Sequence, residues 1–352
     1  MSARGWFLFA LMSVIWGIPY LMIKVAVDGG GGDAGGGVSV PMVVFARTAL
    51  GAALLLPLAL RAGRFGQLRG HAVPILGFAA FEIIGPWALL SDAERHLDSS
   101  TTGLLIAAVP ILAVVLARLT GGDERLGVRR WAGLAVGLGG VALLAAPQLS
   151  GGSAWSLTEV LLTAVGYAAA PLIAARRLRE VPTLPLTATC LTLAAVVYAP
   201  PAVATWPDTR PSAEVLASLA GLGVICTALG FVIFFELIRE VGASRAMVFT
   251  YVSPAVAVVA GVALLDEPLT ATVLGSFGLI LTGCLLATAR DRAGATEPAA
   301  PEAGPVGPVS PDRPVAGSAA ERSRRRGGRR PRNGPDGGSP NGTRWRSPSR
   351  RP

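Results

Sequence analysis

Charged side chains are scarce in this chain. Asp, Glu, Lys and Arg make up 15% of its 352 residues, whereas soluble domains carry roughly 25%. Apolar residues reach 52%, and the mean hydropathy is +0.55. Several apolar runs have the length of about 20 residues that a helix needs to cross a bilayer. The composition excludes an ordinary soluble protein and predicts an all-α integral membrane protein.

Cysteine and histidine are also rare, which excludes several kinds of chemistry. The three cysteines (Cys190, Cys226 and Cys284) lie far apart inside apolar runs, without the spacing of a metal site or a disulfide framework. The two histidines, His71 and His96, lie in expected loops. No Gly-rich phosphate loop ending in Lys-Ser or Lys-Thr is present, so ATP-driven transport is not encoded. We expect no metal and no cofactor.

The positive charge belongs to the last part of the chain. Residues 290–352 hold 14 Arg against 6 Asp and Glu, with almost no large apolar residue. This composition cannot bury a core, so the segment is expected to be a disordered cytoplasmic tail. Its basic run, Arg322 to Arg332, fits attraction to anionic membrane lipid better than specific nucleic-acid binding.

One pattern occurs twice in the apolar part of the chain. The stretch DSSTTGLLIAAVPILAVVLARLTGGDERL (98–126) has an echo in GASRAMVFTYVSPAVAVVAGVALLDEPL (242–269), with Pro110 matching Pro254 at an offset of 144. Such internal repeats are typical of transporters. We expect one repeat over 6–147 and a second over 156–289. The ten predicted spans are 6–27, 40–60, 72–92, 99–119, 131–147, 156–175, 184–204, 214–237, 245–264 and 270–289.

Loop charges predict how these spans are oriented. With the N-terminus inside, the inner loops carry twelve arginines, and the outer loops carry only Arg95 and Arg210. Positive residues favour the cytoplasmic side, so both termini are expected in the cytoplasm. Five spans per repeat is an odd number, so the second repeat enters the membrane upside down. Inverted repeats provide two near-equal packings, which is the basis of alternating access.

The duplicated stretches, together with WGIPYLMIK (16–24) and FARTALGAALLLPL (45–58), resemble the drug/metabolite transporter superfamily of the ten-span EamA type. The resemblance covers about residues 6–289. It implies two EamA repeats and the export or exchange of small metabolites or drugs across the cytoplasmic membrane, without naming a substrate. The Gly-rich loop GGGGDAGGG and the arginine tail depart from the family pattern.

Three ionisable residues within the predicted spans are candidates for substrate binding or coupling, because such groups are costly in a bilayer. Lys24 lies near the outer end of the first span, where it could also be an interfacial anchor. Arg47 could pair with an acidic side chain or bind an anionic substrate group. Glu82 lies near the middle of the third span; it could couple transport to protons, bind substrate, or be a hydrogen-bonded structural carboxyl.

Prolines and aromatic residues complete the candidate site. Pro110 and Pro254 remove a backbone donor within their spans, and broken helices often line a midplane cavity. Trp16, Trp87, Tyr167 and Tyr251 could form the cavity walls, although interfacial belts and packing explain such residues as well.

Acidic pairs and glycines mark the junctions and contacts of the spans. Asp123/Glu124 and Asp266/Glu267 are expected to stabilise the N-terminus of the helix that follows each pair, with a gating role as the alternative. Gly133 and Gly137 in the fifth span, and Gly275, Gly278 and Gly283 in the tenth, predict close helix packing, either within one protomer or in a homodimer.

The sequence therefore predicts a secondary transporter of small molecules, with lipid as its environment and proton coupling as a hypothesis. One alternative is a non-transporting scaffold or sensor whose basic tail recruits a partner. A less favoured alternative is an intramembrane enzyme, which would need a second catalytic group beside Glu82. Deleting residues 290–352 separates the first two, because a transporter would keep its activity.

Overall fold

Helices make up all the regular structure in the described part of the chain. The computed structural model describes residues 2–29, 36–120, 127–150, 153–242 and 246–288. Eight helical stretches there are long and apolar enough to cross a membrane, and two shorter apolar helices follow them. This agrees with the ten predicted spans. The described helices belong to one compact unit within Met1–Gly294. The predicted tail lies outside the described residues.

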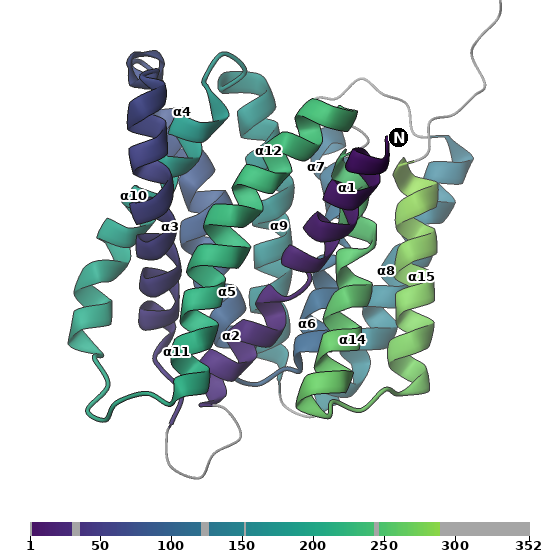
Figure 1. The fold of residues 1–352 in the computed structure, drawn as a ribbon. Helices are drawn as coiled ribbons and strands as arrows, with labels where there is room; N and C mark the ends of the chain where they lie inside the picture. Colours follow the sequence, from purple (N-terminus) through teal and green to yellow (C-terminus); the bar gives the residue numbers. More distant parts are fainter. Residues whose placement is uncertain (1, 30–35, 121–126, 151–152, 243–245, 289–352) are drawn as a thin grey trace, which may run out of the picture. The chain divides into compact units, whose positions relative to one another are not determined.

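The observed bounds follow the apolar runs closely (Figure 1). In chain order, the ten spans consist of the following elements: α1 (Ala3–Ile15) and α2 (Pro19–Asp28); α3 (Val40–Ala62); α4 (Ala72–Ala79), η2 (Ala80–Ile84) and α5 (Gly85–Ala93); α6 (Ser99–Ile106) and α7 (Val109–Leu119); α8 (Val128–Ser150); α9 (Ala154–Arg177); α10 (Thr183–Ala204); α11 (Ala213–Ala220), η3 (Gly221–Leu229) and α12 (Gly230–Val241); η4 (Met247–Tyr251) and α14 (Ser253–Leu265); α15 (Ala271–Thr288). A short 3₁₀ turn, η1 (Phe65–Leu68), lies between α3 and α4.

Five of the ten spans are irregular near their middle. The first, fourth and ninth are interrupted, and the helix that resumes carries a proline in its first turn: Pro19, Pro110 and Pro254. Proline lacks the backbone donor but suits the first turn, so it favours a restart at this point. The third and eighth spans instead contain π-helical segments, η2 and η3. Insertions of this kind are frequent at functional sites.

The two repeats run in opposite directions. Ser99, which begins α6 in the fourth span, contacts Glu267, which follows the end of α14 in the ninth span. The helices α6 and α14 therefore lie antiparallel. The fifth and tenth spans show the same relation, because Gly133 near the start of α8 contacts Ala287 near the end of α15. The inverted arrangement predicted from the loop charges is present in the fold.

Helix pairing also follows this internal symmetry. The first span packs on the eighth and the sixth on the third, whereas the second and seventh, the fourth and ninth, and the fifth and tenth pair with each other. In Figure 1, α3 lies beside α10, and α8 lies beside α15. We call the end of the bundle that holds Arg61, Arg118, Arg176 and Arg239 the arginine end, and the other end, with Glu94 and Glu267, the opposite end.

Glycines decide how closely α8 and α15 approach. A Cβ atom at Gly133 would lie 2.5 Å from the backbone nitrogen of Ala287, and one at Gly283 would overlap the backbone of Gly137. Small residues let two backbones meet in this way. The predicted packing therefore occurs within one protomer. Around Gly278 there is open space, and a homodimer stays a prediction.

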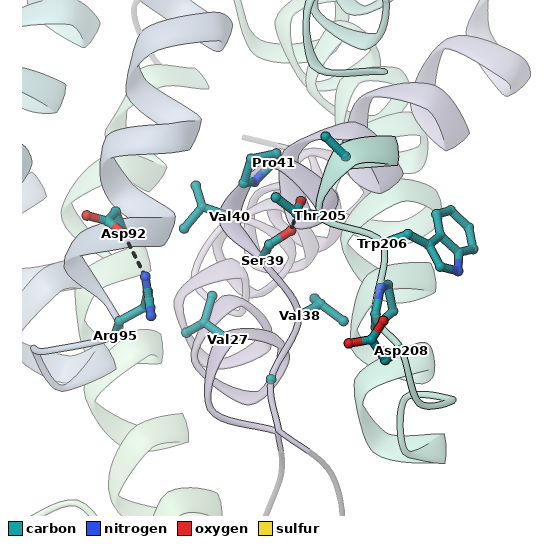
Figure 2. A pocket seen from close by; sticks show the side chains of 13 residues that line it. Val27, Val38, Ser39, Val40, Pro41, Asp92, Arg95, Thr205, Trp206 and Asp208 are labelled. Carbon is teal, nitrogen blue, oxygen red and sulfur yellow. Dashed lines mark hydrogen bonds and ion pairs between the residues drawn. The ribbon is translucent and has the colours of Figure 1, made fainter. Parts of the chain in front are cut away.

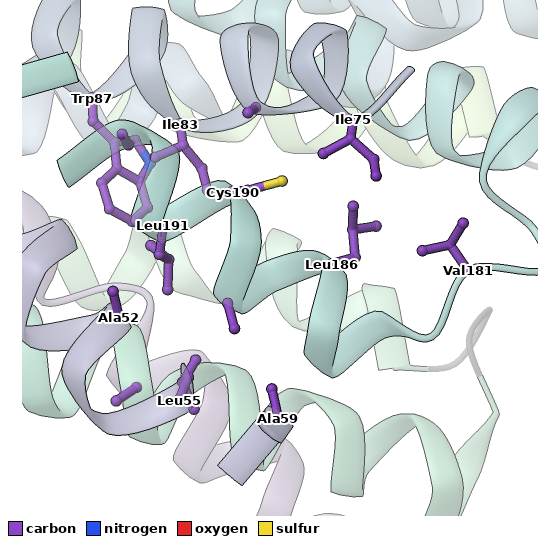
Figure 3. Packing of buried hydrophobic residues seen from close by; sticks show 14 of the residues in the cluster. Ala52, Leu55, Ala59, Ile75, Ile83, Trp87, Val181, Leu186, Cys190 and Leu191 are labelled. Carbon is purple, nitrogen blue, oxygen red and sulfur yellow. The ribbon is translucent and has the colours of Figure 1, made fainter. Parts of the chain in front are cut away.

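One cluster of buried apolar residues joins α3, α4, α5 and α10. Figure 3 shows Leu55 and Ala59 of α3 facing Leu186 and Leu191 of α10. Ile75, Ile83 and Trp87 close the cluster from the third span. This packing fixes the position of Trp87, which also lines the cavity described next.

Candidate functional site

A cavity of about 900 Å³ lies among the irregular spans. Its wall includes residues on both sides of the interruptions in the first, fourth and ninth spans, and residues of both π-helical spans. Toward the arginine end the lining continues to Arg118 and Arg130. The cavity is large enough for a small metabolite, since ligand pockets usually measure roughly 300–1,000 Å³.

The structure brings eight of the nine predicted site residues together around this cavity. They come from the first, second, third, fourth, sixth and ninth spans: Trp16, Arg47, Glu82, Trp87, Pro110, Tyr167, Tyr251 and Pro254. Lys24 is not among the lining residues and lies at the opposite end. The roles of these residues in binding stay predictions.

Arg47 is a buried cation at the inner part of the cavity, away from Arg118 and Arg130 at the arginine end. Its side chain is 7% exposed, its Nε donates a hydrogen bond to Thr227 Oγ1 at 3.0 Å, and its Cζ lies 3.6 Å from the centroid of the Trp87 ring. None of the ion pairs among the described residues involves Arg47. The guanidinium is thus oriented by a hydroxyl and an aromatic face, while its charge has no carboxylate partner there.

Two features of the backbone bring the Thr227 hydroxyl within hydrogen-bonding distance of Arg47. A Cβ atom at Gly51, one turn after Arg47 on α3, would lie 2.7 Å from the Thr227 methyl group, so glycine makes the approach possible. Thr227 in turn donates to the carbonyl of Leu222 at 2.8 Å, five residues earlier in the π-helical segment η3. This second bond holds the hydroxyl with its lone pairs toward Arg47.

Trp16 connects the break in the first span to the eighth span. Its Nε1 donates to the carbonyl of Cys226 at 3.1 Å, and its ring contacts Phe231, Phe234 and Phe249 with centroid separations of 5.1–5.7 Å. Aromatic groups at such distances and tilts stabilise one another beyond simple burial. Trp16 is therefore a rigid part of the cavity wall.

Glu82 lies in the short π-helical segment η2, between α4 and α5. It lines the cavity, and no hydrogen bond or ion pair of its carboxyl is found within the described ranges. The structure therefore does not support a hydrogen-bonded structural carboxyl. The π-helical geometry was not predicted, although Gly85 and Pro86 follow the segment directly.

The wall of the cavity is built from symmetry-related positions. At the same offset of 144 that relates Pro110 to Pro254, lining residues of the fourth span have lining partners in the ninth: Ile106 and Thr250, Ala107 and Tyr251, and Val109 and Ser253. The two repeats thus contribute matching faces.

Lys24 belongs to a different group of residues. Its Nζ lies 3.0 Å from Asp28 Oδ2 and donates to the backbone carbonyl of Glu94 at 2.7 Å. The sequence-based alternative of an interfacial anchor fits this position, one turn before the end of α2. Lys24 ties α2 to the segment after α5 and does not face the cavity.

A second, polar depression lies at the opposite end (Figure 2). It is about 790 Å³ and includes Val27, Ser39, Asp92 and Thr205. Ser39 and Thr205 share a hydrogen bond of 2.6 Å, and Arg95 pairs with Asp92 at 3.4 Å. Since Asp92 and Arg95 pair with each other and no residue of the depression was predicted as functional, we treat it as a surface feature of the loops.

Some lining residues were missed by sequence reasoning. Tyr20 lines the cavity and contacts α6 at Gly103; an aromatic residue directly after Pro19, inside a predicted span, is the signal that could have found it. Thr227 carries no such signal, because its partner Arg47 is 180 residues away in sequence.

Interrupted helices from two antiparallel halves around a cavity of small-molecule size define a helical membrane transporter. The family is equally clear from sequence comparison. The model of the EamA-like transporter family matches residues 3–146 and 154–289, and this chain belongs to that family.

Relatives and a solved structure agree with this assignment. The uncharacterized inner membrane transporter YedA of Escherichia coli is 26% identical over 290 residues, covering 80% of this chain and 89% of that protein. A probable terminal-alkyne amino-acid exporter of Streptantibioticus cattleyicolor is 30% identical over 297 residues, covering 79% and 92%. A solved crystal structure aligns with a TM-score of 0.57 at 18% identity, covering 82% of this chain and 98% of the other. That last likeness shows the fold.

Proposed function

We propose that this transporter carries small molecules with an anionic group, such as a carboxylate, and that Arg47 binds that group. The observation that carries the proposal is the buried Arg47 guanidinium, oriented by Thr227 and Trp87 and facing a cavity without a carboxylate partner in the described residues. A buried unpaired charge is costly, and an arginine fork matches a carboxylate with two parallel hydrogen bonds.

The direction proposed is export from the cytoplasm. The lining of the cavity reaches the arginine end at Arg118 and Arg130, and an excess of basic residues favours the cytoplasmic side. Both termini would then lie in the cytoplasm. A basic entrance also raises the local concentration of anions. One relative is named as an exporter of an amino acid, a molecule with a carboxylate, which supports the same direction and chemistry.

The test compares matched ligands on the purified full-length protein. Amino acids and their carboxamides differ at the carboxylate, so both are measured by ligand-dependent thermal stabilisation and then as counter-flow substrates in proteoliposomes. We expect the acids to bind and the amides to bind about tenfold or more weakly, because the amide loses the charge-assisted pair. Arg47→Gln should remove this discrimination. Equal binding of acids and amides would overturn the proposal.

A role of Glu82 in proton coupling is proposed on separate grounds. Its carboxyl faces the same cavity and has no partner among the residues described. The direct experiment is pH-gradient-driven flux in proteoliposomes, with Glu214→Gln, an exposed acid in the first turn of α11, as the matched control. Glu82→Gln should strongly reduce the stimulation by a pH gradient while counter-flow of substrate continues. Flux that stays fully pH-dependent in this variant would remove Glu82 from coupling.

A further inference from the structure

Glu267 clamps the first turn of α6 at the opposite end. Its Oε1 accepts from the Ser99 backbone N–H and hydroxyl, each at 2.7 Å. Its Oε2 accepts from the Ser100 N–H at 2.9 Å and from the Ser100 hydroxyl. Glu267 is 8% exposed, and its carboxylate occupies the positive end of the α6 dipole. The sequence predicted that it would stabilise the following helix, α15; it stabilises α6 of the other repeat instead.

The local backbone is shaped for this contact. Asp266 adopts a left-handed conformation with φ 52°, which is uncommon for a residue other than glycine. It ends α14, and the Glu267 N–H then bonds the Gly261 carbonyl at 3.2 Å. A Cβ atom at Gly261 would overlap the Glu267 carboxylate and lie 2.5 Å from Ser100 Oγ. Glycine at position 261 thus makes room for the clamp.

The clamp joins the two repeats on the side away from the arginine end. It links the start of the fourth span to the end of the ninth, and both spans are interrupted where they line the cavity. One turn after the clamp, Gly103 of α6 meets Tyr20 of the cavity wall and Ala257 of α14. While Glu267 holds Ser99 and Ser100, α6 and α14 stay in contact between the cavity and the opposite end. A bound molecule then has no route out of the cavity between these two helices.

Glu94 is a buried residue whose carboxyl group lies near Glu267. It is 0% exposed, and neither of its carboxyl oxygens has a hydrogen-bond partner within the described residues. The charged groups around it come from several elements: Lys24 and Asp28 on α2, Arg47 on α3, and Glu267 after α14. Burial holds the pKa of Glu94 well above its usual range, against the opposing effect of Lys24. Asp98, also near Glu267, has its pKa raised mainly by burial.

We propose that Glu267, Ser99 and Ser100 form the outer gate of the transporter, and that Glu94 takes up a proton when this gate closes. The inference rests on the proposed orientation, which makes the opposite end extracellular. A carboxyl without partners is stable in a buried site as the neutral acid. When the gate opens, Glu94 meets water and releases the proton to the outside. Raising the external pH therefore favours the open outer gate, and lowering it favours closure.

Accessibility of the cavity from outside measures the gate without any substrate. The full-length chain with its three cysteines replaced by alanine receives Ala113→Cys, a small change in the cavity wall. Right-side-out membrane vesicles are treated with a membrane-impermeant, cationic methanethiosulfonate. We expect modification of the thiol at position 113 to be about tenfold faster at about pH 8.5 than at about pH 5.5, after correction for the thiol's own titration in detergent-unfolded protein.

Variants of the two acids separate the parts of the proposal. Glu267→Gln should speed external modification by about tenfold or more at both pH values, because it loses the charge-assisted hydrogen bonds. Ser100→Ala removes one donor and should give a smaller change of the same sign. Glu94→Gln imitates the neutral acid and should leave modification slow at both pH values. Glu214→Gln, an exposed acid at the same end, is the control that should behave like the parent.

The results test the gate, the proton site and the orientation separately. Unchanged external modification in both Glu267→Gln and Ser100→Ala would overturn the gate. A pH response of Glu94→Gln equal to that of the parent would overturn the proton site. Rapid modification of the parent from outside, with slow modification in inside-out vesicles, would show the opposite orientation and overturn the proposal. Failure of the proposed substrate class would leave all these rates unaffected, because no substrate is present.

Discussion

Arg47 in the cavity and Glu267 at the opposite end are buried charges of almost equal exposure, 7% and 8%, yet their surroundings differ. Glu267 accepts four hydrogen bonds from two serines. Arg47 makes one hydrogen bond and one aromatic contact. One charge is satisfied by the fold itself, whereas the other keeps donors available to a ligand.

This difference separates a structural contact from a binding site. The Glu267 carboxylate has all its hydrogen bonds made and holds α6 and α14 together. It exchanges partners when these helices move. A guanidinium held by Thr227 and Trp87 is preorganised, and its remaining donors face the cavity. Mutations at the two places should therefore affect different measurements.

The largest effect is expected for Arg47→Gln. Substrate flux in proteoliposomes should fall about 100-fold, since the anionic group loses its charged partner in a site of low dielectric constant. The melting temperature in detergent should stay close to that of the parent, because Arg47 is in none of the ion pairs of the described residues. If the variant lost both flux and much of its thermal stability, Arg47 would be a structural charge like Glu267, and the proposed difference between the two residues would be wrong.

A smaller effect, on stability, is expected for Glu267→Ala. The backbone donors at Ser99 and Ser100 would lose their partner, which should cost about 2 kcal/mol, read as a lower melting temperature. Ligand affinity in the detergent-solubilised protein should change little, since the contact lies outside the cavity. Gly261→Ala offers a second measurement, because its added methyl group overlaps the same carboxylate; stability unchanged in both variants would contradict the clamp.

The smallest effect is expected for Thr227→Val, which keeps the size of the side chain and removes the hydroxyl. Arg47 would lose one orienting bond, so the affinity for an anionic substrate should fall about fivefold. Thr192→Val on α10, whose hydroxyl bonds its own helix at Ala188, is the matched control and should bind normally. Equal weakening in both variants would mean that Thr227 acts through packing alone.

Much of the fold could be predicted because it depends on local composition. Apolar runs of sufficient length, separated by loops rich in arginine or glycine, give the ten spans within a few residues of the observed helices. Pro110 and Pro254 mark interruptions correctly, since the missing donor acts wherever the residue is placed. The π-helical segments η2 and η3 were not predicted, because an extra residue in a turn is tolerated only when its neighbours in space accept it.

The residues of the candidate site also divide into those that the local sequence could identify and those that depend on helix packing. Arg47 and Glu82 could be selected from sequence, because a charge inside a bilayer span needs a reason of its own. For Lys24 the sequence left two possibilities, a cavity residue or an interfacial anchor, since the side of a helix that faces the cavity depends on which helices surround it. Thr227 was missed for the same reason, because its partner Arg47 is 180 residues away in sequence.

The sequence by itself determined the membrane class, the two inverted repeats, the family and the residues with unusual chemistry, because hydrophobicity, charge and proline act locally. Tertiary structure decided their partners. It placed Trp87 and Thr227 on Arg47, brought Glu267 to α6 instead of α15, and buried Glu94 without a partner among the described residues. These contacts join residues far apart in the chain, and only the packing of ten helices brings them within hydrogen-bonding distance.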